Sequence, residues 1–181
     1  AFAADRYWVG GSGNWDGTTT HWSATSGGAS GASSPGTSDN VFFNASSSVA
    51  QAAYTVTVNS TANCLNFTLE GTGSTTKATL AGTQILNIYG NLTASSTSAI
   101  TWSYTGSLVL QQSTGTSVIT SGNNRIIKIT LNAAATFQLA DNLRTGEFTK
   151  VASASFDANL KTVTIDNGGS IFSATYGGLY T

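Results

Sequence analysis

The strongest catalytic candidates in this chain are its carboxylates, although only eight of its 181 residues are Asp or Glu. Glycosidases hydrolyse sugar polymers with two such groups held roughly 5–10 Å apart. Asp141 and Asp166 stand in the turn-like contexts "ADNL" and "IDNGG", and Asp157 follows an aromatic residue in "FDAN". Glu147 could approach one of them in a fold of short coils. We expect solvated corner residues instead, so a polysaccharide depolymerase is the least favoured interpretation.

The other reactive side chains are His21, the only histidine, and Cys64, the only cysteine. A zinc site needs several clustered ligands, and a catalytic triad needs a histidine held by an acid beside a particular serine. One histidine and no Gly-x-Ser-x-Gly sequence support neither, so we predict no catalytic residue, no metal and no cofactor. The strand-like neighbours of Cys64 predict a buried thiol, and a lone cysteine forms no intrachain disulfide.

The opening segment "RYWVGGSGNWDGTTTHWS" (6–23) concentrates large aromatic side chains, with tryptophans about seven residues apart. The Gly and Thr residues between them disfavour helix, which excludes a coiled-coil seam. We predict a hydrophobic cap, because the end of a stacked fold must be covered. A sugar-binding aromatic platform and a protein-contact surface are the alternatives. The predicted cap residues are Trp8, Trp15, His21, Trp22 and Phe42, with Tyr7 beside them.

Charge is scarce: the formal net charge is -1, and 8% of the residues are Asp, Glu, Lys or Arg. Seven Lys and Arg residues scattered along the chain cannot form the basic stripe that neutralises phosphates, so we expect no nucleic acid partner. The chain also lacks an apolar run approaching the roughly 20 residues that span a bilayer, so we expect no membrane insertion. Its 40% hydrophobic residues argue against disorder.

Short alternating apolar runs repeat from about residue 62, including "CLNFTLEG", "ILNIYGNLT", "SLVLQQ" and "IIKITLN". Apolar positions recur at steps of about 21 or 22 residues, at Leu65, Leu86, Leu108 and Ile129. Such a period is typical of a solenoid whose coils share one core. We therefore predict an all-β, single right-handed parallel β-helix, with an antiparallel β-sandwich as the alternative. Residues 1–60 would form an irregular aromatic cap region, and residues 61–181 the coils of one cooperative domain.

A second aromatic pair stands outside the predicted cap. Trp102 and Tyr104 occupy alternate positions in "ITWSYTG" and would share one face of a strand. We predict that they form an exposed contact patch, the alternative being that they pack inside.

The segments "YWVGG" (7–11), "GNW" (13–15), "HWS" (21–23) and "SDNVFFNASS" (38–47), with "FDANLKTVTI" (156–165), form one pattern across the chain. This pattern resembles uncharacterised phage virion and bacterial surface proteins. The resemblance implies a structural, non-enzymatic capsid decoration or tail fibre protein on a virion, or an extracellular surface protein. Its partners would be other virion or cell-surface proteins and further copies of the chain. A surface adhesin that binds a host glycan or receptor is the alternative. Asn44 replaces the Asp expected after the aromatic pair, which disfavours a calcium site there.

Overall fold

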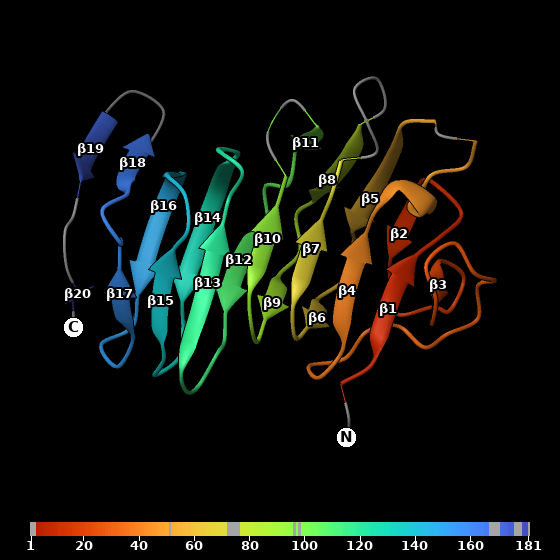
Figure 1. Ribbon diagram of the computed structural model, residues 1–181, viewed down its shortest axis with the longest axis horizontal. Helices are drawn as coiled ribbons and strands as arrows, with labels where there is room; N and C mark the ends of the chain where they lie inside the picture. Colours follow the sequence, from red (N-terminus) through yellow and green to blue (C-terminus); the bar gives the residue numbers. More distant parts are fainter. Residues whose placement is uncertain are drawn as a thin grey trace.

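The computed structural model describes residues 3–50, 52–71, 77–95, 97 and 99–166, with the backbone of 171–175 and 179–180. In this part of the chain the strands form three sheets that wrap around one core (Figure 1). Sheet A contains β1 (Asp5–Trp8), β3 (Trp22–Ser23), β4 (Asn40–Phe43), β7 (Phe67–Leu69), β10 (Leu92–Ala94), β13 (Thr116–Thr120), β15 (Thr136–Leu139), β17 (Ser155–Asp157) and β20 (Leu179–Tyr180). Sheet B contains β2 (Gly13–Trp15), β5 (Tyr54–Val58), β8 (Ala78–Gly82) and β11 (Ile100–Trp102). Sheet C contains β6 (Ala62–Cys64), β9 (Leu86–Ile88), β12 (Ser107–Leu110), β14 (Arg125–Leu131), β16 (Leu143–Lys150), β18 (Thr162–Asp166) and β19 (Ile171–Thr175), and η1 (Ala45–Ser47) is a short helical turn.

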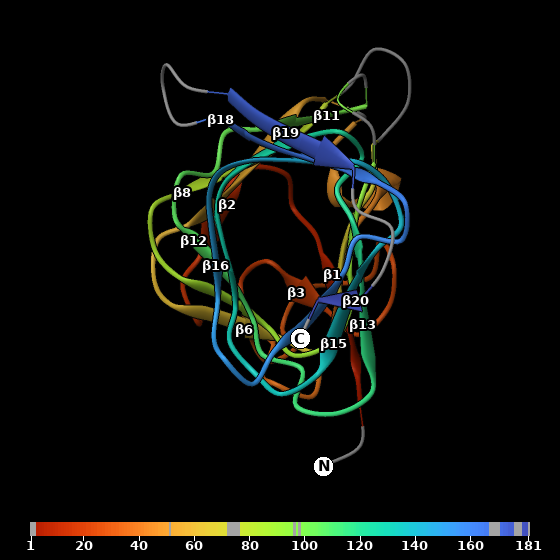
Figure 2. The same ribbon diagram turned by 90° about the vertical axis from the view of Figure 1, so that its left-hand side faces the viewer.

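The coils form a right-handed parallel β-helix, as the sequence predicts. Successive coils pair in parallel within each sheet, which rules out the antiparallel sandwich. Viewed from the C-terminal end, the chain passes from sheet A to sheet B to sheet C anticlockwise while it advances towards the viewer (Figure 2). This sense of rotation defines a right-handed helix.

Alternation of apolar and polar residues explains why these short segments form strands. In β5, Tyr54, Val56 and Val58 point into the core, and the threonines between them face outwards. The β-branched residues suit a pleated surface that is buried on one side. One continuous cluster of buried side chains runs from Trp8 in the first coil to Val163 in the last.

Coil length changes along the solenoid. In sheet A, Val41, Phe67, Leu92 and Ile119 are successive register partners, 25–27 residues apart. Beyond β13 the step falls to 19–20 residues, because β14 and β16 follow β13 and β15 directly, with no strand of sheet B described between them. The turn before β14 is tight: Gly122 and Asn123 both have positive φ, and a Cβ on Gly122 would overlap the Ser95 carbonyl of the coil below.

The coils begin before the predicted boundary at residue 60. Strands β1, β2, β4 and β5 lie within residues 1–60, and they pair in parallel with one another or with strands of later coils. The irregular cap is the segment between β2 and β4, which contains β3. At the other end the parallel stacking stops, because β19 and β20 run antiparallel to β18 and β17.

A ladder of amide side chains connects four coils along sheet C. Asn87 Nδ2 donates to Asn63 Oδ1 at 3.1 Å, and Asn87 Oδ1 accepts from Gln111 Nε2 at 3.2 Å. Gln111 Oε1 in turn accepts from Asn132 Nδ2 at 3.1 Å. The two inner amides, Asn87 and Gln111, each donate to one neighbour and accept from the other, so the ladder helps to fix the register of the coils.

Candidate functional site

The three tryptophans of the opening segment lie inside the N-terminal end of the solenoid. Trp8, Trp15 and Trp22 are each at most 1% exposed. Trp22 packs edge-on against the other two, with ring centroids 5.1 Å apart in both pairs. Trp8 Nε1 donates to the Gly11 carbonyl at 2.6 Å, which satisfies its polar atom. These rings are core residues of the first coils, and none has a face free to stack on a sugar.

The chain between β2 and β4 covers this aromatic end. Strand β3 runs antiparallel to β1 and places Trp22 opposite Trp8. The Trp22 carbonyl accepts from the amides of Gly31 and Ala32, both at 3.0 Å. Arg6 fastens the same segment to β1, because its guanidinium donates to the carbonyl and the hydroxyl oxygen of Ser33, both at 3.0 Å. The segment between β2 and β4 has the composition of a loop, and these hydrogen bonds hold it in place over the tryptophan rings.

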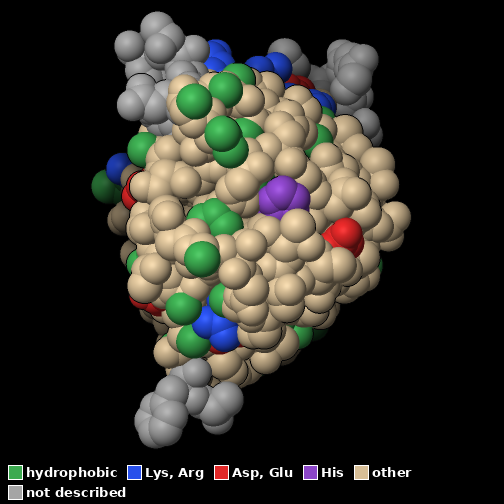
Figure 3. Space-filling model, turned by 90° about the vertical axis from the view of Figure 1, so that its right-hand side faces the viewer, with side chains coloured by type: hydrophobic (Ala, Val, Ile, Leu, Met, Phe, Trp, Pro, Cys, Tyr) green, Lys and Arg blue, Asp and Glu red, His purple; other side chains and the backbone are tan. Residues whose placement is uncertain are grey.

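His21 lies at the surface of the cap rather than in its core. Its ring stacks on Trp8 with centroids 4.5 Å apart and an angle of 4° between the planes. Nδ1 lies 2.8 Å from the Val9 carbonyl, which can only accept, so Nδ1 carries the proton. Nε2 lies directly over Gly13, where no side chain would fit. On the largely uncharged N-terminal face, this imidazole is partly exposed (Figure 3).

Phe42 was predicted as a cap residue, and this prediction is wrong. Phe43 fills that place: it is fully buried and contacts all three tryptophan rings. Val41 and Phe43 share the inner face of β4, so Phe42 points outwards. There it stacks on Tyr7 of the preceding coil with centroids 4.9 Å apart.

The prediction of an exposed patch at Trp102 and Tyr104 is also wrong. Tyr104 is fully buried, its hydroxyl donates to the Gln84 carbonyl, and burial raises its pKa. Trp102 is partly buried at the last rung of sheet B and contacts the rings of Phe67 and Tyr104. Trp102 Nε1 has no hydrogen-bond partner within the described residues. Both rings extend the aromatic core instead of offering a surface.

The acids that could have formed a depolymerase site hold the coils together. Asp141 accepts from the amides of Ser121 and Gly122 at 2.8 and 2.6 Å, which closes the turn before β14. Asp157 accepts from the Gln138 amide group at 2.7 Å. Glu147 lies 3.4 Å from the ammonium group of Lys128 in an exposed pair. The structure therefore distributes these carboxylates among separate structural contacts.

Asp166 has the strongest electrostatic environment among them. Its two carboxylate oxygens lie 2.5 and 2.6 Å from Nε of Arg125 and of Arg144, two register partners in neighbouring coils. The hydrogen bond from Arg125 is the main reason that the pKa of Asp166 is lowered, and Arg144 adds to it. This cluster connects the last described coil to the two coils before it.

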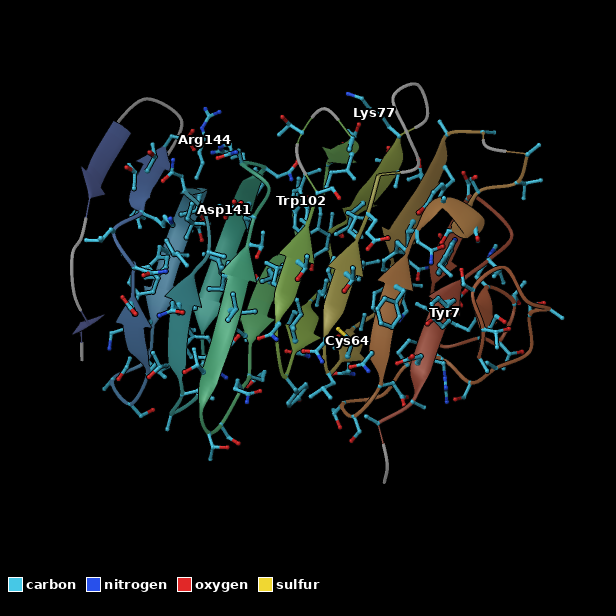
Figure 4. The ribbon with its side chains drawn as sticks, in the orientation of Figure 1. Tyr7, Cys64, Lys77, Trp102, Asp141 and Arg144 are labelled. Atoms are coloured by element: carbon cyan, nitrogen blue, oxygen red, sulfur yellow. The ribbon has the colours of Figure 1, made fainter. Side chains whose placement is uncertain are left out.

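The outer face of sheet A carries two regular rows of side chains, which the sequence analysis did not identify. The first row consists of register partners in five successive strands: Tyr7, Phe42, Thr68, Thr93 and Thr120. The second row runs beside it and consists of Asp5, Asn40, Asn66 and Asn91. Figure 4 shows Tyr7 at the N-terminal end of this face. We call the two rows the sheet A face.

Hydrogen bonds order the second row. Asn40 Nδ2 donates to Asp5 Oδ1 at 2.9 Å, and Asn66 Nδ2 donates to Asn40 Oδ1 at 2.8 Å. Asn66 Oδ1 accepts from the backbone N–H of Asn91 at 2.7 Å. The recurrence of Asn two positions before Phe42, Thr68 and Thr93 was the signal in the sequence that would have located this face.

Comparison of the chain with protein-family models, curated proteins and solved structures finds no match. The described residues contain no helix that is long and apolar enough to cross a membrane. Among the same residues, no group of three or more His, Cys, Asp or Glu side chains is placed to hold a metal ion.

Proposed function

We propose that the chain is a structural, non-enzymatic component of a virion or of a cell surface, such as a capsid decoration or tail fibre protein. The observation that carries the proposal is the single core that continues from Trp8 to Val163 without a break. Each coil buries its apolar face only against its neighbours, so the stack behaves as one stiff element. The cap covers the N-terminal end of that core. Without it, the open strand edges at this end could pair with other chains.

The side chains that could have done chemistry support a structural role. The described carboxylates of the later coils hold turns and neighbouring coils, as Asp141 and Asp166 do. Burial raises the pKa of the Cys64 thiol, which makes it a poor nucleophile. The sequence resemblance to virion and bacterial surface proteins points to the same role. Contacts with other surface proteins and with further copies of the chain would use its uncharged outer faces.

The test is to locate the chain on purified particles and on cells of its source by immunogold electron microscopy. Regular labelling of a capsid or tail supports the virion assignment, and labelling confined to cells supports a cell-surface protein. If neither the particles nor the cells are labelled, the proposal is wrong. A second experiment measures the release of reducing ends from surface polysaccharides. If the chain cleaves the polymer and Asp157→Asn or Asp166→Asn abolishes the cleavage, the non-enzymatic role is wrong.

A further inference from the structure

We propose that the sheet A face binds a neutral polysaccharide that lies along the solenoid axis. The inference is independent of the virion or cell-surface assignment, since it depends only on the side chains of this face. The tryptophans of the opening segment are buried, so a sugar would have to contact another surface.

The spacing between neighbouring side chains in the row from Tyr7 to Thr120 matches the spacing between units of an extended sugar polymer. Its five members are register partners in hydrogen-bonded strands, and neighbouring strands lie about 4.8 Å apart. The row is therefore about 19 Å long. This spacing is close to the length of one sugar unit, so consecutive units of a straight chain would meet equivalent positions.

The aromatic pair supplies an apolar contact at one end of the row. The rings of Tyr7 and Phe42 lie 17° from parallel with centroids 4.9 Å apart, which is an offset stack. Both residues are partly exposed on the outer face. Because each ring covers one face of the other, a sugar lying along the row would contact the exposed parts of the pair. The stack holds both rings in place before any ligand arrives, which lowers the entropic cost of binding.

The rest of the row offers hydroxyl groups without charge. The hydroxyls of Thr68, Thr93 and Thr120 make no hydrogen bond to other described residues, and each can donate and accept. Threonine loses little rotamer freedom because its χ1 is already restricted. Such groups suit the hydroxyls of a sugar.

The charges around the face favour a neutral ligand. The outward side chains of β4, β7, β10 and β13 include no Asp, Glu, Lys or Arg. Two carboxylates lie on its border: Asp5 begins the amide row, and the exposed Glu70 follows β7. The cation beside Tyr7, Arg6, is turned towards the cap, where its guanidinium donates to Ser33. A sulfated or uronic acid polymer would be repelled by both carboxylates.

The experiment measures retention of the full chain on insoluble cellulose, chitin and β-1,3-glucan, with alginate and heparin resins as anionic probes. The test variant combines Tyr7→Thr with Phe42→Thr, because threonine already occupies the next positions of the row. We expect an apparent affinity about tenfold lower for the retaining neutral polymer. A second variant, Thr93→Lys, places a long charged side chain across the row while both rings stay in place, and we expect the same loss.

Thr79→Ala is the matched control, because Thr79 occupies an equivalent outward position on sheet B. Melting curves of all variants show whether the fold is retained. Loss of retention in both test variants, with the control unchanged, supports the proposal. Absence of retention on every neutral polymer overturns it, as does retention on the anionic resins alone. Retention that survives in Thr93→Lys and in the folded double variant also overturns it. None of these outcomes depends on where the chain is located in its source.

Discussion

Truncation of Trp15 tests how strongly the aromatic end of the core stabilises the solenoid. Trp15 is 1% exposed, and its ring contacts those of Trp22 and Phe43. Trp15→Ala should lower the free energy of unfolding by about 3–5 kcal/mol, the usual cost of deleting a buried tryptophan. For a chain of this size the melting temperature should fall by roughly 6–20 °C.

In Trp15→Ala the loss of stability should start in the N-terminal coils. Stability in a solenoid is close to a sum over coils and their interfaces, and β2, which carries Trp15, pairs in parallel with β5. Circular dichroism melting measures the total loss, and hydrogen exchange should show the amides of β2 and β5 losing protection before those of β14 and β16.

Val49→Ala is the matched control, because Val49 belongs to the same N-terminal region but is 58% exposed. We expect a change within about 0.5 kcal/mol. If Trp15→Ala melts within about 2 °C of the parent chain, the assignment of Trp15 to the core of the first coils is wrong.

Three further predictions concern single contacts. Gly13→Ala would overlap the His21 imidazole, so we expect a loss of about 1–3 kcal/mol in urea unfolding; an unchanged midpoint would show that the ring moves freely. Asn87→Ala breaks the amide ladder on both sides and should cost about 1 kcal/mol, whereas an unchanged stability would mean that solvent replaces both bonds. The pKa of Asp166 is lowered in the folded chain, so its stabilising contribution is present above the unfolded value of about 3.9 and is lost as the pH falls through the folded value. Acid unfolding followed by fluorescence should show this loss, and Asp166→Asn should reduce it; identical pH profiles would contradict the assignment.

The sequence predicted the coils well where apolar residues repeat at constant spacing. Leu86, Leu108 and Ile129 are direct register partners in sheet C, as their spacing indicates. Leu65 is not the next member, because Ala62 pairs with Leu86 and the strand ends at Cys64. A periodic pattern measures coil length, but it does not show where a strand stops and a corner begins.

Side-chain direction was predictable within strands and not beyond them. Side chains alternate between the two faces of a strand, so within β4 Phe43 shares a face with Val41, and Phe42 lies on the other face. This signal was present in "NVFF". Tyr104 lies after the end of β11, where the alternation of a strand no longer predicts the direction of a side chain. Its burial depends on the Gln84 carbonyl of the preceding coil, a contact between residues that are distant in sequence. For the same reason the rows of the sheet A face become visible only when the register is known.

The coil lengths also bear on how fast the chain folds. Neighbouring strands within sheet A pair residues 19–27 positions apart from β4 to β17. That separation corresponds to a relative contact order of roughly 0.10–0.15, nearer to mixed α/β domains than to sandwiches and barrels. Folding should therefore be faster than is usual for an all-β protein. Lengthening the solenoid by further coils would leave the separation between partners unchanged, so the loop-closure cost of each added coil would stay the same.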